Sequence, residues 1–154
     1  MPLRMYLAQY SRHGDTAKEP KDYLPRHWVI AIRFSKPEGG KSTGTVLHVK
    51  GVTGGQWEFE RINDDVYARS PAWAGCIFLG TIDASNVDKL ERLLATIPLQ
   101  HGHATWNSQN WAWDALKLMR QQGYNVQLPA SKSVMDEMMI KAKSVDWEHA
   151  DDSN

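Results

Sequence analysis

Apolar and polar residues alternate over several short stretches in the first half of the chain, which is the period-two pattern of β-strands. The segments with this pattern are 4–11, 27–35, 45–51 and 55–62, and a short apolar run follows at 76–82. Residues 27–35 (HWVIAIRFS) give the clearest prediction, because aromatic and β-branched residues favour strands. Polar segments rich in Gly, Pro and charge separate the strands, at 12–26, 35–44 and 63–74. This spacing predicts antiparallel hairpins.

In the second half, apolar residues recur at helical spacing, which predicts three helices, over 86–99, 108–122 and 131–145. Pro98 ends the first helix and Gly123 stops the second. The third helix is expected to bury a stripe of Val134, Met138 and Met139. Because strands come first and helices last, the fold class expected is α+β, with an antiparallel sheet from the N-terminal strands packed against the C-terminal helices.

Length and charge narrow the class of protein. The 154 residues predict a single domain over 1–154, in which the acidic tail at about 146–154 (DWEHADDSN) is expected to be frayed. Eighteen basic residues balance eighteen acidic ones, so no excess of positive charge indicates a nucleic acid or a membrane surface as partner. The sequence does not indicate an oligomeric state.

The location expected is cytoplasmic. The start of the chain does not resemble a signal peptide, and no run approaches the roughly 20 apolar residues that span a bilayer. The one cysteine, Cys76, cannot form an internal disulfide, which is natural in a reducing compartment. Cys76 lies in the apolar run 76–82 and is expected to be a small core residue.

A group of small polar residues opens the second predicted helix, inside the segment WNSQNWAW (106–113). At about 100° per residue, Ser108 falls on the same side of the helix as the apolar residues, which places it on the inward face. The first turn also presents unpaired backbone N–H groups that stabilise a developing oxyanion. Two interpretations are open: Asn107 or Ser108 is an N-cap, or Ser108 is a nucleophile.

Two histidines lie on neighbouring predicted strands. His27 begins the segment 27–35 and shares its face with Val29 and Ala31, whose small side chains would let a helix approach closely. A histidine at a strand end that faces a helix N-terminus is well placed as a general base. His48, one hairpin away, could orient that imidazole through a ring hydrogen bond. The alternative for each histidine is a structural or exposed side chain.

The other histidines predict no metal or cofactor site. His101 and His103 have i, i+2 spacing, but no third or fourth ligand accompanies them at a metal-binding spacing. We expect them to line the rim of the site or to be substitute partners within it. His13 and His149 lie in a predicted loop and in the tail.

Together these motifs resemble a known superfamily. HW at the start of a strand, a second histidine on the next strand, and N-[nucleophile]-Q at the start of an aromatic helix resemble the permuted NlpC-type, papain-like superfamily, which includes lecithin retinol acyltransferase. Within it, the chain looks most like a group of small fungal proteins of unknown function, over roughly residues 5–125.

The resemblance implies a permuted papain-like fold and a role for each matching residue. His27 corresponds to the base, His48 to the orienting group and Ser108 to the nucleophile. Asn107 and Gln109 match the residues that flank the nucleophile, and the backbone N–H of residue 108 would contribute to an oxyanion hole.

The chain departs from the pattern of the superfamily at the nucleophile, where serine replaces the expected cysteine. A thiol ionises near pH 8.5, whereas a hydroxyl must lose its proton during the attack, so a site tuned for cysteine would be slow with serine. Three explanations stand: a serine introduced to trap substrate, which we favour, a natural serine enzyme, or a site retained for binding.

The function that these residues indicate is acyl transfer on an amide, ester or thioester of a small molecule or peptide. Seven tryptophans are present, and we expect Trp28, Trp106 and Trp111 to wall the substrate pocket, with Asn107 and Gln109 beside it. No cofactor is implied.

Two alternatives remain open. The first is synthesis of arginine-containing cyclic dipeptides from aminoacyl-tRNA, an activity of some small fungal proteins that would use the same covalent chemistry. It requires a basic patch beside the pocket, for which the candidates are Arg26, Arg33, Lys36, Lys41 and Lys50. The second alternative is a catalytically inactive binding module.

Overall fold

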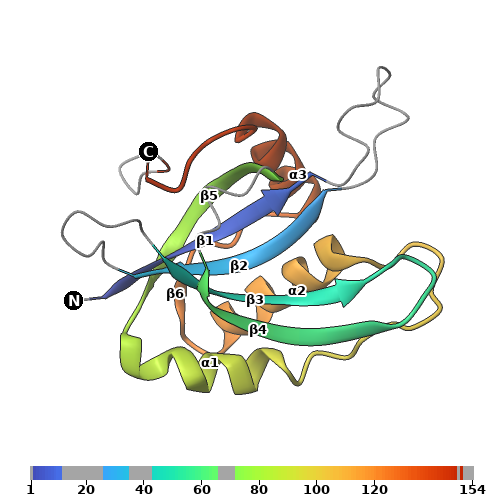
Figure 1. The fold of residues 1–154 in the computed structure, drawn as a ribbon, viewed down its shortest axis with the longest axis horizontal. Coiled ribbons are helices and arrows are strands. Elements are labelled where there is room, and N and C mark those ends of the chain that lie inside the picture. The colour runs from blue at the N-terminus through green and yellow to red at the C-terminus, as the bar shows by residue number, and fades with distance from the viewer. Residues whose placement is uncertain (1, 12–25, 35–42, 66–71, 149, 151–154) are drawn as a thin grey trace.

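The computed structural model describes residues 2–11, 26–34, 43–65, 72–148 and 150. Within these described residues, six strands form one curled antiparallel sheet in the order β4-β3-β2-β1-β5-β6 (Figure 1). The strands are β1 (Leu3–Tyr10), β2 (His27–Arg33), β3 (Gly44–Gly51), β4 (Trp57–Asp65), β5 (Trp73–Ile82) and β6 (Asn125–Val126). The helices are α1 (Val87–Leu94), α2 (Ser108–Gln121) and α3 (Lys132–Lys141), with a 3-10 turn, η4 (Ala84–Asn86), before α1. The α+β prediction is confirmed.

The element boundaries differ from the predicted ones in several places. β4 continues to Asp65 and β5 already begins at Trp73, so both strands extend into the predicted loop 63–74. Trp73 joins the ladder because it pairs with Tyr10 of β1. The short strand β6, which pairs with β5, was not predicted. The predicted loop segments 12–25 and 35–42 lie outside the described residues.

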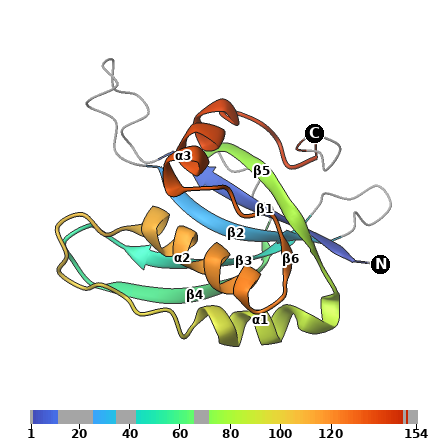
Figure 2. The ribbon, with the colours of Figure 1, turned by 180° about the vertical axis from the view of Figure 1, so that it is seen from behind.

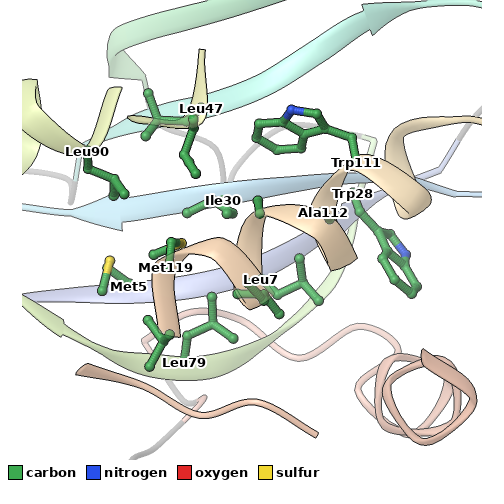
Figure 3. Close-up of a cluster of buried hydrophobic side chains, with 14 of the residues drawn as sticks. Met5, Leu7, Trp28, Ile30, Leu47, Leu79, Leu90, Trp111, Ala112 and Met119 are labelled. Atoms are coloured by element: carbon green, nitrogen blue, oxygen red, sulfur yellow. The ribbon is translucent and has the colours of Figure 1, made fainter. Parts of the chain in front are cut away.

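The main core lies between the sheet and helices α1 and α2 (Figure 2). β1 contributes Leu3, Met5 and Leu7, every second residue, because successive strand side chains point to opposite faces. Figure 3 shows Trp111, Ala112 and Met119 of α2 packed among sheet residues such as Ile30 and Leu79. Ser108 lies on this inward face, as predicted.

A second core covers the opposite face of the sheet. It contains Tyr6, Val29, Ala31, Cys76 and Trp147, all buried. The prediction that Cys76 is a core residue is confirmed. The prediction of a frayed tail is wrong for its described part, because Trp147 is 1% exposed and Ala150 is also buried. Residues 149 and 151–154 of that tail lie outside the described residues.

Helices α1 and α3 are shorter than predicted, and the buried stripe of α3 is different. α1 ends at Leu94 and not at residue 99, and α3 ends at Lys141 and not at residue 145. Met135 and Met139 are the buried residues of α3, whereas Val134 is 39% exposed. The prediction of Val134 as part of the stripe is therefore wrong. No helix in the described part of the chain is both long and apolar enough to cross a membrane.

The sheet divides at the start of β2. β2 pairs with β1 along its whole length, but it pairs with β3 only from Ile30–Leu47 to Arg33–Gly44. Beyond that point β3 and β4 curve away from β2, and the first turn of α2 lies close to the division (Figures 1 and 2).

α2 packs on the Trp28–Ile30–Ile32 face of β2, not on the face of His27, Val29 and Ala31. The prediction that a helix covers the small side chains of the His27 face is therefore wrong. Those side chains pack in the second core, where Val29 and Ala31 lie in one cluster with Trp147.

Candidate active site

The start of α2 is held by its own asparagines. Asn107 is the N-cap, and its side-chain oxygen accepts a hydrogen bond of 2.9 Å from the backbone N–H of Gln109. In return, the side chain of Asn110 accepts a 3.0 Å bond from the N–H of Asn107, which completes a capping box. Asn107 therefore does the capping, and Ser108 is the first residue inside the helix.

The hydroxyl of Ser108 is buried against the start of β2. Ser108 is 1% exposed, and its Oγ accepts a 3.2 Å hydrogen bond from the backbone N–H of Trp28. Trp28 precedes the part of β2 that pairs with β3, so its amide takes the serine as acceptor. Trp28 N is bonded to the carbonyl carbon of His27, which puts Ser108 Oγ within about 6 Å of His27 Cα. The structure thus brings residues 27 and 108 together.

His27 and His48 are hydrogen-bonded to one another, Nε2 of His27 to Nδ1 of His48, at 2.8 Å. The two rings stand edge to face, with centroids 5.0 Å apart. A second bond of 2.9 Å joins His48 Nε2 to Glu60 Oε1, and Lys50 Nζ donates to Glu60 Oε2 at 3.0 Å. The line of hydrogen bonds Glu60–His48–His27 therefore runs from β4 across β3 to β2.

Sequence reasoning missed Glu60. The signal was available, because Glu60 stands directly opposite His48 in the β3–β4 ladder. Directly opposed side chains in an antiparallel pair lie on the same face and interact. Aligning the predicted strands 45–51 and 55–62 as a hairpin in this register would have found the pair.

Burial and hydrogen bonding determine the protonation states of His48, Glu60 and Lys50. Burial lowers the pKa of His48, and the hydrogen bond to Glu60 only partly opposes that effect. The hydrogen bonds from His48 and Lys50 lower the pKa of Glu60, while the bond to Glu60 raises the pKa of Lys50. At neutral pH, Glu60 is thus a carboxylate and His48 is a neutral imidazole.

A cavity of about 300 Å³ opens beside the first turn of α2. Residues Arg26, Trp28 and Gln109 line one side, and Asp136, Met139 and Ile140 of α3 line the other. Gln109 ties the helix to the chain before β2, because its Nε2 donates to the carbonyl of Arg26 at 3.0 Å. The indole of Trp28 points away from Trp111, as Figure 3 shows, and Lys132 Nζ of α3 lies 5.5 Å from its ring centroid.

Trp106 and Trp111 both pack in the main core. Trp111 is completely buried in the main core, where its ring lies 6.1 Å from that of Phe59. Trp106 is buried edge to face against Trp57 at 5.6 Å. Trp28 lines the cavity, whereas Trp106 and Trp111 are not among its lining residues, and the role of the three indoles in a substrate pocket stays a prediction.

The remaining histidines that the structure describes stabilise the loop before α2. His101 Nδ1 accepts a hydrogen bond from the backbone N–H of Trp57 at 3.0 Å. His103 Nδ1 accepts from the N–H groups of Thr105 and Trp106, both at 3.1 Å. Among the described residues, no group of three or more His, Cys, Asp or Glu is arranged to hold a metal ion. His13 and His149 lie outside the described part of the chain.

The described members of the candidate basic patch are dispersed. Arg26 borders the cavity, but Arg33 lies at the far end of β2, where it donates to the carbonyl of Trp147 at 3.4 Å. Lys50 is paired with Glu60 and lies 3.7 Å from a carboxylate oxygen of Glu58. Lys36 and Lys41 are outside the described residues.

Comparison with known proteins identifies a family. Residues 5–125 match a family of unknown function, DUF6540. No curated protein and no solved structure matches the chain.

Proposed function

The chain belongs to the DUF6540 family of unknown function, and from the geometry of the site we propose that it is an acyl-transfer enzyme with a permuted papain-like arrangement. In this arrangement Ser108 is the nucleophile, His27 is the base and His48 orients the base. The substrate is an amide, ester or thioester of a small molecule or peptide. The resemblance of HW, the second histidine and N-S-Q to papain-like motifs supports the same assignment.

The observation that carries the proposal is the meeting of α2 and β2. Ser108 Oγ is bonded to the amide that directly follows His27, and His27 is hydrogen-bonded to the buried ring of His48. A nucleophile, a base and an orienting group make up the catalytic triad of acyl-transfer enzymes. Here the base and the orienting group are hydrogen-bonded to each other, and the proposed nucleophile is bonded to the backbone amide next to the base.

The proposed reaction proceeds in two steps. As Ser108 Oγ forms a bond to the carbonyl carbon, its proton passes to His27, and the carbonyl oxygen becomes an oxyanion. The N–H of Ser108 lies in the first turn of α2, where amides have no intrahelical partner, and it stabilises that oxyanion. The imidazolium of His27 then gives its proton to the leaving group, and the acyl group stays on Ser108. Water or an amine attacks this acyl-enzyme while His27 accepts its proton. His27 then returns the proton to Ser108 Oγ as the bond between Oγ and the acyl carbon breaks, which releases the product.

The cavity indicates a small acyl group. Its volume of about 300 Å³ is at the lower end of the range of ligand pockets, roughly 300–1,000 Å³. Trp28, Met139 and Ile140 provide apolar walls, and Gln109, the neighbour of the nucleophile, lies at its edge. We therefore expect short, largely apolar acyl groups to be preferred to long ones.

The test is a comparison of the chain that carries Ser108 with Ser108→Cys. Both proteins are incubated with a panel of esters, thioesters and aminoacyl esters, and intact mass detects a covalent acyl adduct. We expect Ser108→Cys to accumulate an adduct at residue 108 and His27→Ala in the same background to abolish it. Burial raises the pKa of the Cys76 thiol, and a Cys76→Ala background excludes labelling there. If no donor gives an adduct with serine or cysteine at position 108, the acyl-transfer proposal is wrong.

The burial of Ser108 favours a second candidate, a binding module. Its hydroxyl already serves as acceptor for the Trp28 amide and is shielded from solvent, which is a sufficient structural role. This candidate predicts ligand binding in the cavity without an adduct from either residue. An adduct formed only from aminoacyl-tRNA would instead support cyclic dipeptide synthesis, although the dispersed basic residues do not favour that function.

A further inference from the structure

Glu60 begins a line of hydrogen bonds that ends at the proposed base. Its Oε1 is 2.9 Å from Nε2 of His48, and Nδ1 of His48 is 2.8 Å from Nε2 of His27. The three side chains come from three consecutive strands in space, β4, β3 and β2. Each ring therefore has one nitrogen facing the previous member of the line.

The rules of hydrogen bonding assign a proton to each contact. An ionised carboxylate can only accept, so Nε2 of His48 must carry a hydrogen. A neutral imidazole has one N–H, so Nδ1 of His48 is an acceptor, and Nε2 of His27 must donate to it. In neutral His27, Nδ1 then holds the lone pair. That nitrogen is the one that can take a proton from a nucleophile.

We propose that Glu60 is a positioning residue that fixes the tautomers of both His48 and His27 and so makes Nδ1 of His27 the proton acceptor of the site. The catalytic consequence rests on the proposed function, whereas the assignment of the tautomers rests on the three side chains alone. Without the carboxylate, His48 could present either an N–H or a lone pair to His27, and the base would be distributed between its two ring nitrogens.

Lys50 holds the carboxylate in place. Its ammonium group donates to Oε2 of Glu60 at 3.0 Å, which leaves Oε1 for His48. The same contacts keep the pKa of Glu60 below its usual value, because both partners favour the charged form. The partially buried site thus retains an acceptor at the end of the line throughout the neutral pH range.

The matched control is Glu58. It lies two residues from Glu60 on β4, so it is on the same face, and its carboxylate is also near Lys50, at 3.7 Å. Glu58→Gln removes the same charge as Glu60→Gln but leaves the bond between Glu60 and His48 intact. A difference between the two variants therefore reports on that bond and not on the charge of the strand.

The first measurement is the long-range proton–nitrogen NMR spectrum of the imidazole rings at neutral pH. His27→Gln and His48→Gln variants assign the signals among the six histidines of the chain. We expect the native protein and Glu58→Gln to show Nε2–H tautomers at both His27 and His48, and Glu60→Gln to show mixed tautomers at both. Native His27 protonated at Nδ1, or unchanged tautomers in Glu60→Gln, would overturn the proposal.

The second measurement uses the Ser108→Cys, Cys76→Ala background and iodoacetamide as probe. The thiolate displaces iodide from the methylene carbon, so a carbon–sulfur bond forms while His27 keeps the thiol proton. We expect Glu60→Gln to slow alkylation by about tenfold or more, because a base held in the wrong tautomer accepts the proton poorly. Glu58→Gln should stay within about twofold of its parent, on the scale of exposed surface changes.

The two measurements separate the failure of this inference from that of the proposed function. If the tautomers respond to Glu60→Gln but no acyl donor labels residue 108, the acyl-transfer proposal fails and the positioning of both rings by Glu60 stands. If acyl adducts form while Glu60→Gln leaves the tautomers and the alkylation rate unchanged, the proposed function stands and the role of Glu60 is refuted.

Discussion

The Ser108 hydroxyl supplies the acceptor for the buried amide of Trp28, at the place where β2 parts from β3. Replacing it with alanine removes that acceptor and leaves a backbone N–H unsatisfied in the interior. A buried donor without a partner costs about 1–3 kcal/mol, so we expect Ser108→Ala to lower the free energy of unfolding by that amount in urea denaturation. Ser133→Ala on the exposed face of α3 is the control and should change it by less than about 0.5 kcal/mol. Equal stability of the two variants would show that the Trp28 amide does not need Ser108.

His48 should make stability depend on pH. Burial lowers its pKa from the ordinary value of 6.5, so below pH 6.5 the unfolded chain binds a proton that the folded chain does not. The contribution of His48 to the free energy of unfolding should therefore fall as pH decreases from 6.5 toward the lowered pKa, and it should be constant above pH 6.5. Chemical denaturation from pH 5 to 8 measures this slope. His48→Gln should flatten the slope, and a variant that keeps the native slope would contradict this account.

Sequence could single out Ser108, His27 and His48 as candidate site residues because their chemistry is unusual for their positions. A polar residue on the inward face of a helix, and histidines at neighbouring strands, stand out against apolar surroundings. Glu60 did not stand out, since an acidic residue in an exposed-looking hairpin is ordinary, and only the β3–β4 register reveals its partner. Trp106 and Trp111 were assigned to a pocket because an indole suits a core and a ligand site equally well.

At the level of elements, strand positions were predicted better than the face of α3. The strands alternate clearly, so their buried residues follow from the period. α3 contains VMDEMMI, in which apolar residues are distributed around much of the helix, and the wheel cannot select one face. Tertiary packing makes that choice, and it buries Met135 and Met139.

The buried face of α3 can be tested by truncating one side chain on each face. Met139 is 1% exposed, lines the cavity and accepts a 2.8 Å hydrogen bond from Gln9 at its backbone carbonyl. Met139→Ala should cost about 2–5 kcal/mol, as buried large-to-small changes do. Val134→Ala, on the exposed side, should stay within about 0.5 kcal/mol of the native chain. Urea denaturation of the two variants decides, and a loss for Val134→Ala as large as that for Met139→Ala would restore Val134 to the buried stripe.

On the scale of the whole molecule, two layers of side chains enclose one sheet, and the chain returns after α3 to cover the second face. Sequence reasoning missed this return because the tail is acidic and polar on average, a composition typical of frayed ends. One apolar residue in this polar tail, Trp147, is enough to hold it against the sheet. Trp147 is 1% exposed and lies near residues of β1, β3 and β5. Its ring is 6.1 Å from those of Tyr6 in β1 and Trp73 in β5, and a Cβ at Gly44 of β3 would meet it at 3.1 Å.

Trp147 therefore packs at the centre of the second core, and its removal should lower the stability of the whole fold. Trp147→Ala would leave a cavity over the central strands, where Val29 and Ala31 are too small to fill it. The expected loss is about 3–5 kcal/mol in the free energy of unfolding, a large share of the roughly 5–15 kcal/mol typical of a domain.

Trp147→Phe keeps an aromatic ring in the same place and should lower the free energy of unfolding less than Trp147→Ala does. Val52→Ala is the control, because Val52 is 63% exposed, and it should lower that free energy by less than about 0.5 kcal/mol. Thermal and urea denaturation rank the three variants. β2 carries His27 on the face of the second core. Partial unfolding of this core in Trp147→Ala should therefore also shift the imidazole NMR signals of His27. A Trp147→Ala chain as stable as Val52→Ala would mean that the second core does not depend on the returning segment.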